Sequence, residues 1–520
     1  MQTSRCSACG QPDLRFLEAT TKSYSLPPHL LQSNEAVDDE NMVSLRRTLE
    51  DARRDKFLLE RRITFLEGIL QKDITNYHSV RSAVHQYHLV VSSFPLRHLP
   101  AEIILEIAFW TIDSESGLAD VLDCTRGPWP MAQVCKRWRE VLLDSSALWS
   151  NLSICYNYAR PQCAVPLLMT YLERSKTHPL TIGYQAKGVD PRLSATLLGV
   201  AVVHSQRWKT LRLQFSSYML DALRRAKGRM ETLEKLDIAL APKETSNGLN
   251  LDIFSSAPRL RCLSVVNFPN IDRVVFPWLQ LTDYRAIQTH VKEHISVLRQ
   301  TPNLLECTLT CEGQHRAADI SHGAPPIVLP RLMILGLHGS AISVLQAIRA
   351  PGLRILLAEN INKAVYVEGS FRSFVSACSS LTHLSIPSCI PPDEVLNVLQ
   401  MDNLLTLNSL RLDLEISGSH SQFGAMMQFL RYKEDPGACV LSELQHISMS
   451  VYCSAGSLNI AEIVGMVKSR CKMPETMFST HHLLRKLRSF ELEINHSGGP
   501  AFEQLKLLQD EGLDLTLRLR

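Results

Sequence analysis

LTHLSIPSCIPPDEVLNVL, residues 381–399, contains the two elements from which the C-terminal two thirds of the chain are built. Leu381, Leu384 and Ile386 follow the spacing apolar-x-x-apolar-x-apolar, which predicts a short strand whose apolar residues face inward. The residues from Pro391 to Leu399 then predict a helical return. The unit expected here is therefore a strand followed by a helix that runs back.

The same spacing recurs along the chain, with starts mostly about 20–28 residues apart, which is the leucine-rich-repeat period. One unit cannot bury its own apolar face, so units must stack, and stacked strands form a curved wall. The Asn that closes many regular repeats is mostly missing. We therefore predict an α+β repeat protein with an irregular leucine-rich-repeat (α/β) solenoid over residues 156–520, in a pattern that resembles leucine-rich-repeat proteins. The triplets are Trp208-Leu211-Leu213, Leu233-Leu236-Ile238, Leu260-Leu263-Val265, Leu304-Cys307-Leu309, Leu332-Leu335-Leu337, Leu353-Leu356-Ala358, Leu381-Leu384-Ile386, Leu407-Leu410-Leu412, Leu444-Ile447-Met449 and Leu487-Phe490-Leu492.

Within each unit, the variable residue between the last two apolar positions should point to the concave side, because side chains alternate along a strand. This row is Arg212, Asp237, Ser264, Thr308, Gly336, Leu357, Ser385, Arg411, Ser448 and Glu491. Its mixed, mostly small character suits protein recognition better than a nucleic-acid groove. Near the C-terminal end, a locally acidic patch for a basic protein segment is expected, and simple solvation of the carboxylates is the alternative. The candidate substrate-binding residues are Arg411, Asp413, Glu415, Glu491 and Glu493.

A different pattern precedes the repeats, in LRHLPAEIILEIAFW, residues 96–110. Pro100 suits the first turn of a helix, where a missing N–H group has no cost. Glu102 and Glu106 are four residues apart and share one narrow face, and the residues from Ile103 to Trp110 are otherwise apolar. A helix with so wide an apolar surface must be buried on two sides. A small helical module can cover one side, and a partner protein is the natural cover for the other.

LPAEIILEI (99–107), QVCKRWREV (133–141) and ALWSNL (147–152) resemble the F-box family in order and spacing, most closely the expanded F-box family of mushroom-forming fungi. The departure is a spacer of roughly 20 residues before Met131, longer than in minimal F-boxes. The resemblance implies an F-box over residues 93–155 that docks a Skp-type adaptor and, through it, a cullin scaffold and a RING–E2 module. The candidate adaptor-binding residues are Leu99, Pro100, Ile103, Ile104, Ile107, Trp110, Val134, Cys135, Trp138, Leu148 and Trp149.

A long amphipathic helix is expected over residues 41–92, after a poorly ordered leader at residues 1–40. Interleaved acids among its arginines argue against nucleic-acid binding. The charged residues Lys56 and Asp73 interrupt the apolar stripe, which favours a helix laid against the F-box over a homodimer, although the homodimer remains an alternative. The stripe is Met42, Leu45, Leu49, Ala52, Lys56, Leu59, Ile63, Leu66 and Leu70, extended through Tyr77, Val80, Val84 and Tyr87.

Catalytic and cofactor motifs are not found in the sequence. Cys6-Ser7-Ala8-Cys9 has the spacing of half a zinc knuckle, but a closed zinc site needs four ligands, so a disordered leader is the preferred interpretation. No phosphate loop, nucleophile elbow or zinc-protease motif is present. We expect a non-catalytic protein without a cofactor or a metal.

Composition narrows the expected partners and location. The net charge of +3 on 520 residues gives no general attraction to nucleic acid or membranes. The singly scattered cysteines are typical of reduced thiols in the cytosol or nucleus. The expected function is the substrate-recognition subunit of an SCF-type (Skp adaptor–cullin–F-box) E3 ubiquitin ligase. The alternative is a non-ligase scaffold in which the helix and the solenoid bind proteins, and co-purification of an adaptor would distinguish the two.

Overall fold

The structure is a computed structural model of the 520-residue chain. Two compact units are present, Met1–Pro100 and Ala101–Arg520, and each is described by itself. The residues that the structure describes are 22–32, 36–92, 98–112, 119–155, 161–185, 191–240, 252–268, 270–271, 274–313, 325–416, 420–432, 441–453, 460–471, 478–479, 482–483, 485–495 and 499–519.

The first unit is dominated by one helix. After the short α1 (His29–Gln32), α2 runs without interruption for 54 residues from Asp39 to Ser92, a length of about 80 Å. Asp38 caps its N-terminus, because its Oδ1 accepts the Asn41 N–H at 3.0 Å. The predicted long helix is confirmed. Most of the predicted leader lies outside the described residues, and α1 forms inside it.

The second unit contains a fifteen-stranded parallel sheet in which the strands follow one another in chain order. Its strands are β1 (Ala119–Asp120), β2 (Asn151–Cys155), β3 (Leu180–Gln185), β4 (Trp208–Phe215), β5 (Lys235–Leu240), β6 (Cys262–Val266), β7 (Asp283–Gln288), β8 (Glu306–Cys311), β10 (Ile334–Gly339), β12 (Ile355–Ile361), β13 (His383–Ile386), β14 (Ser409–Ile416), β15 (His446–Cys453), β18 (Ser489–Ile494) and β19 (Asp514–Leu519). Two small ladders join β9 (Ile327–Val328) to β11 (Ile348–Arg349) and β16 (Phe478–Ser479) to β17 (His482–Leu483).

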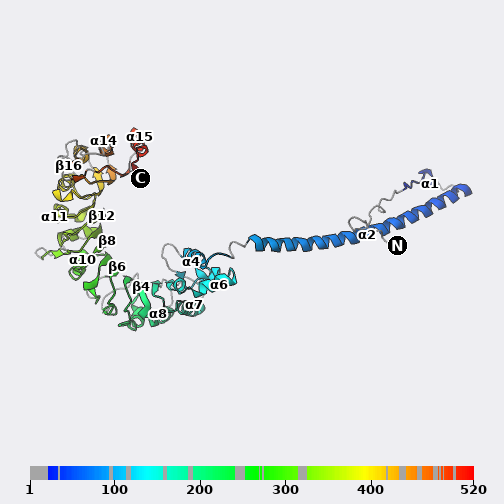
Figure 1. The fold of residues 1–520 in the computed structure, drawn as a ribbon, viewed down its shortest axis with the longest axis horizontal. Helices are drawn as coiled ribbons and strands as arrows, with labels where there is room; N and C mark the ends of the chain where they lie inside the picture. Colours follow the sequence, from blue (N-terminus) through cyan, green and yellow to red (C-terminus); the bar gives the residue numbers. More distant parts are fainter. Residues whose placement is uncertain are drawn as a thin grey trace. The chain divides into compact units, whose positions relative to one another are not determined.

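Helical segments connect the strands and lie on the outer side of the arc that this unit forms, whereas the strands line its inner side (Figure 1). The α-helices are α4 (Ala101–Trp110), α5 (Pro128–Met131), α6 (Lys136–Asp144), α7 (Pro161–Arg174), α8 (Pro191–Val203), α9 (Leu220–Arg224), α10 (Val291–Leu298), α11 (Ser370–Ser376), α12 (Pro392–Leu399), α13 (His420–Leu430), α14 (Ile460–Cys471) and α15 (Gly499–Asp510). The 3-10 turns are η2 (Ser146–Trp149), η3 (Ser205–Arg207), η4 (Ser217–Met219), η6 (Trp278–Gln280), η8 (Ser340–Gln346), η9 (Lys363–Val365) and η10 (Asp402–Leu404).

The core is an apolar ladder between the sheet and its helices. The strands pair in a register that places the middle apolar residue of each strand beside that of its neighbour, and every member is buried. Burial of one such side chain contributes about 1.5–3 kcal/mol. The ladder runs through Leu211, Leu236, Leu263, Tyr284, Cys307, Leu335, Leu356, Leu384, Leu410, Ile447 and Phe490.

The predicted outward row also falls on matched register positions. Arg212 pairs with Asp237, Asp237 with Ser264, and at the other end Arg411 pairs with Ser448 and Ser448 with Glu491. The predicted row has a gap at β7, because Leu281-Tyr284-Ala286, which follows the same spacing, is not among the predicted triplets. Arg285 fills this gap, paired with Ser264 and Thr308.

The two expected segments 93–155 and 156–520 do not form separate compact units. Residues 101–155 belong to the same unit as the rest of the sheet, and the division falls after Pro100. The physical reason is that β1 and β2 are the first two strands of the sheet, with Ala119 beside Leu152. Among the described helices, none has the length and apolar character needed to cross a membrane.

Candidate protein-interaction surfaces

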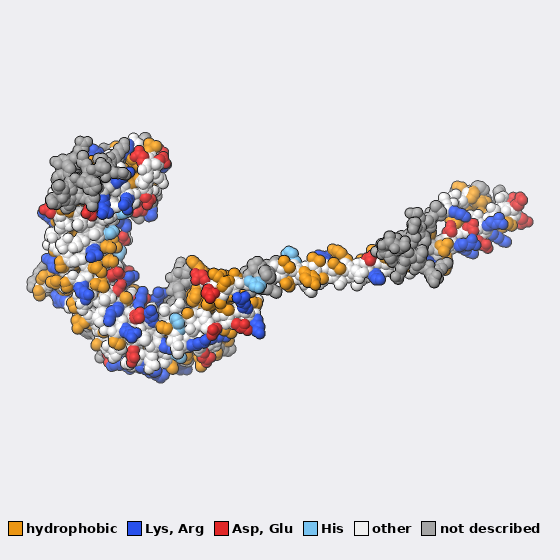
Figure 2. All heavy atoms as spheres, in the orientation of Figure 1, with side chains coloured by type: hydrophobic (Ala, Val, Ile, Leu, Met, Phe, Trp, Pro, Cys, Tyr) orange, Lys and Arg blue, Asp and Glu red, His pale blue; other side chains and the backbone are white. Residues whose placement is uncertain are grey.

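Helix α4 divides its apolar residues between two environments. Ile104 and Ala108 are fully buried in the second unit. Ile103 is 45% exposed, Ile107 and Phe109 are each 38% exposed, and Trp110 is 78% exposed. Hydrophobic side chains gather over this helix in Figure 2. The described structure therefore buries one side of α4 and leaves the other open.

Below this surface, an aromatic cluster ties the helices to the sheet. Trp149 is fully buried, and its Nε1 donates to the carbonyl oxygen of Leu142 at 2.8 Å. Its ring packs edge-on against Trp129 and Tyr171, with ring centroids 5.4 and 5.0 Å apart. The Arg174 guanidinium lies 4.4 Å from the Trp149 ring centroid, a cation–π contact. Desolvation in this cluster lowers the pKa of Arg174. The cluster fixes the base on which α4 and α6 pack.

The long spacer between Trp110 and Met131 contributes to this base. It contains β1, the first strand of the sheet, and α5, which carries Trp129. The extra length therefore extends the sheet and adds the half-buried Trp129 to the aromatic cluster. Sequence spacing did not indicate either role.

The eleven predicted adaptor-binding residues separate into two groups. Ile104, Trp138, Leu148 and Trp149 are buried and hold the module together. The other residues have accessible side chains, half-buried for Leu99 and exposed for Pro100, Ile103, Ile107, Trp110, Val134 and Cys135. We define the α4 surface as Ile103, Ile107, Phe109 and Trp110; Phe109 was absent from the predicted set.

Trp110 is the largest member of the α4 surface and has a fixed partner. Its Nε1 donates to Oε1 of Glu106 at 3.0 Å, one helical turn earlier. The bond satisfies the polar atom of the indole and leaves the apolar ring exposed. Such a residue can contribute much of the binding energy in a protein interface.

The predicted substrate-binding residues lie near one another on the inner face of the sheet but are largely paired. Arg411 contacts Glu359 at 2.8 Å and Asp413 at 3.4 Å. Lys363 pairs with Glu415. Arg518 lies 3.3 Å from Glu491. Ser450 donates to Glu493 at 3.3 Å. We define the C-terminal ionic cluster as the charged residues Glu359, Lys363, Arg411, Asp413, Glu415, Glu491, Glu493 and Arg518.

The carboxylates of this cluster outnumber its bases. Of the three bases, Arg411 was in the predicted set, whereas Lys363 and Arg518 were not. Lys363 and Arg518 lie outside the strand positions of the predicted row, so only the three-dimensional register brings them close. Burial raises the pKa of Asp413, and the charge of Arg411 opposes that rise. The cluster is therefore less negative than its acidic residues alone suggest.

A second ionic cluster lies on β4 to β8. Asp237 contacts Arg212 at 3.3 Å and Lys235 at 3.8 Å, and Arg285 contacts Asp283 at 3.3 Å and Glu306 at 3.8 Å. Between the charged residues of the two clusters lie the uncharged outward positions Gly336 on β10, Leu357 on β12 and Ser385 on β13. Of these, Leu357 is 40% exposed, whereas Ser385 is buried. The inner face thus has two ionic clusters separated by uncharged positions.

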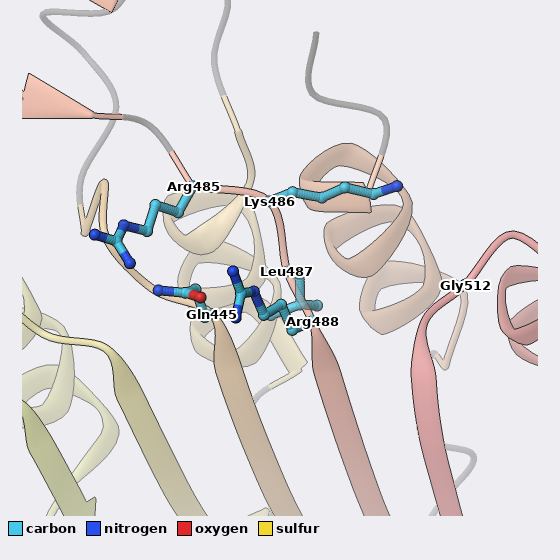
Figure 3. A pocket seen from close by; sticks show the side chains of 6 residues that line it. All are labelled: Gln445, Arg485, Lys486, Leu487, Arg488 and Gly512. Atoms are coloured by element: carbon cyan, nitrogen blue, oxygen red, sulfur yellow. The ribbon is translucent and has the colours of Figure 1, made fainter. Parts of the chain in front are cut away.

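A basic pocket of about 610 Å³ lies where β15, β18 and β19 begin. It is lined by Gln445, Arg485, Lys486, Leu487, Arg488 and Gly512 (Figure 3). Figure 3 shows the side chains of Gln445 and Arg488 close together at the strand ends, and those of Arg485 and Lys486 pointing to opposite sides. The sequence signal, three basic residues within Arg485-Lys486-Leu487-Arg488, was visible but was not among the predicted sites.

Buried ionisable groups occur under the sheet rather than on its inner face. His294 on α10 is fully buried, and its Nε2 lies 3.1 Å from the carbonyl oxygen of Thr310. Desolvation lowers the pKa of His294 to about 4. Glu293 beside it is also buried, which raises its pKa. Both side chains pack within the core of the second unit.

The described part of the chain contains no group of three or more His, Cys, Asp or Glu residues placed to hold a metal ion. Cys6 and Cys9 lie outside the described residues. The buried thiols of Cys307 and Cys378 are free, and desolvation raises the pKa of both, that of Cys378 to about 12. These cysteines are suited to packing rather than to nucleophilic chemistry.

Comparison with known proteins adds no relative. No family model matches the chain, and a search of curated proteins returns no match.

Proposed function

We propose that the protein is the substrate-recognition subunit of an SCF-type E3 ubiquitin ligase. In this proposal the segment around α4 and α6 is an F-box that docks a Skp-type adaptor, and the adaptor links it to a cullin. The observation that carries the proposal is the α4 surface: apolar residues of the LPAEIILEI motif are exposed on a helix whose opposite side is anchored. An interface with an adaptor would remove this apolar surface from water.

The remainder of the second unit would be an irregular leucine-rich-repeat solenoid that binds the target protein. The support is the chain-ordered parallel sheet, the buried ladder and the outward row on the inner face of the arc. Two ionic clusters with the exposed Leu357 between them can match a protein surface, since apolar contacts contribute affinity and charges contribute orientation. A basic segment of the target would face the C-terminal ionic cluster, where the acids outnumber the bases.

Adaptor binding by the full chain tests this proposal. The double variant Ile103→Ala/Trp110→Ala should weaken binding of a purified Skp-type adaptor by 2 kcal/mol or more, about 30-fold. Leu279→Ala is the matched control, because Leu279 is 69% exposed on η6, away from α4. Circular dichroism should show an unchanged fold in both variants.

Two outcomes would contradict the ligase proposal. One is full adaptor affinity in the double variant. The other is no adaptor or cullin in complexes purified with the wild-type chain, which is the result expected of a non-ligase scaffold. The scaffold remains the second candidate because α2 carries its own exposed apolar stripe.

A further inference from the structure

Helix α2 exposes apolar side chains along almost its whole length. Among the described residues, contacts with its first half are made by Tyr24, which donates to Asp55 at 2.5 Å, and by Lys22, which lies 4.0 Å from Asp51. Beside these contacts, Leu45, Ala52 and Leu59 are only partly covered. We call the heptad stripe of α2, together with its charged positions Lys56 and Asp73, the seam. The apolar seam residues that remain exposed are Met42, Leu49, Ile63, Leu66, Leu70, Tyr77, Val80, Val84 and Tyr87.

The seam has a symmetry that a second copy of the helix can use. It extends from Met42 to Tyr87, so its midpoint falls between Thr64 and Phe65. Its two charged members, Lys56 and Asp73, lie at equal distances on either side of this midpoint. The two charges therefore occupy positions that exchange when the helix is reversed.

Helix direction decides which charges meet. In a parallel pair each seam residue faces its own copy, so Lys56 would face Lys56 and Asp73 would face Asp73. In a fully overlapped antiparallel pair, Lys56 of one copy faces Asp73 of the other, and this happens twice. Residues that oppose a parallel coiled coil thus become two opposite-charge pairs in the antiparallel one.

Side-chain size favours the same direction. The antiparallel register places Ala52, the smallest seam residue, opposite Tyr77, one of the largest, whereas a parallel pair would place two alanines together and two tyrosines together. The remaining antiparallel pairs join apolar residues throughout: Met42 with Tyr87, Leu45 with Val84, Leu49 with Val80, Leu59 with Leu70 and Ile63 with Leu66.

We propose that α2 forms an antiparallel homodimer in this register, with Lys56 of each copy paired to Asp73 of the other. The overlap covers about 70 Å of helix. Within one chain Lys56 already lies 3.7 Å from Glu60, so the dimer adds a second carboxylate to the same ammonium group. The dimer would carry two copies of the second unit, whatever those units bind.

Charge exchange in the full chain tests both the dimer and its direction. Lys56→Asp and Asp73→Lys, made singly, each replace two attractive pairs with two repulsive ones and should raise the dimer dissociation constant about tenfold. The double variant Lys56→Asp/Asp73→Lys restores opposite charges and should recover wild-type affinity. A mixture of the two single variants should form heterodimers in preference to either homodimer. Sedimentation equilibrium measures all four, with Lys72→Asp as a control outside the seam.

Three results would overturn the proposal. Equal dissociation constants for the wild type, the single variants and the double variant would indicate a parallel dimer. A chain that is monomeric at tens of micromolar would show that the seam is not a dimer interface. A double variant as weak as the single variants, with its helix content retained by circular dichroism, would contradict the pairing of Lys56 with Asp73.

Discussion

Helix α2 and the fifteen-stranded sheet differ in the burial of their apolar residues. In the sheet, the ladder through Leu384 and Phe490 is buried by helices of the same chain, whereas on α2 the large side chains of Leu70 and Tyr87 are exposed. Helix α4 lies between these cases, with Ile104 buried and Trp110 exposed. Apolar periodicity in the sequence therefore identifies a face suited to packing, but it does not determine whether this chain or another one covers that face.

The largest expected effect compares two aromatic residues. Phe490→Ala removes a fully packed side chain from the ladder and should lower the free energy of unfolding by about 3–5 kcal/mol. Tyr87→Ala removes an exposed one and should change it by less than about 0.5 kcal/mol. Chemical denaturation followed by tryptophan fluorescence checks the first value, because every tryptophan lies in the second unit. Circular dichroism, which also reports the helix content of α2, checks the second value. Similar losses in the two variants would erase the distinction between the regions.

Acid stability should also separate the two regions. Burial holds the pKa of His294 at about 4, against 6.5 in the unfolded chain, so the unfolded state binds a proton more readily. Stability is therefore retained above pH 6.5 and lost as the pH falls from 6.5 toward 4, by up to about 3 kcal/mol. His294→Gln should reduce this loss, whereas His85→Gln on exposed α2 should retain it. Denaturation at pH 7 and pH 4.5 measures the difference, and equal acid loss in all three proteins would remove His294 as its source.

Charge on the inner face should produce a smaller, binding-specific effect. Asp413→Lys, Glu491→Lys and Glu493→Lys together should weaken binding of a labelled Lys/Arg-rich peptide about tenfold at low salt and reduce its salt dependence. Reversal of Asp237, Asp283 and Glu306 in the other ionic cluster is the matched control. Fluorescence anisotropy gives both affinities. If the two triple variants bind equally, the C-terminal ionic cluster has no preference for basic segments.

Sequence spacing was sufficient to predict the strands whose apolar residues were recognised as repeating triplets. The leucines of the ladder fixed strand positions and thereby the outward row, because side chains alternate along a strand. The predicted triplets do not include β1, β2, β3, β7 or β19, although Leu281, Tyr284 and Ala286 at β7 follow the same spacing. The sequence also indicated the long helix, since its heptad stripe is nearly continuous.

Contacts between residues far apart in the sequence could not be predicted from the apolar spacing. Arg518 beside Glu491 and Lys363 beside Glu415 depend on strand register and loop paths across the sheet. The spacer before Met131 showed no strand pattern, yet it supplies β1 and Trp129 because its partners, β2 and Trp149, follow it in the chain. The division of the F-box-like segment between buried and exposed residues likewise required the packing of α4 on its neighbours.

Hydrogen exchange of the full chain, with and without a Skp-type adaptor, tests the proposed adaptor interface at α4, because it reports which surfaces a partner covers. Peptides spanning α4 and α6, residues 98–112 and 131–144, should gain protection, with the inner-face strands β12 and β13 unchanged. Protection confined to the inner face, or no change at α4 when the adaptor is saturating, would contradict this interface.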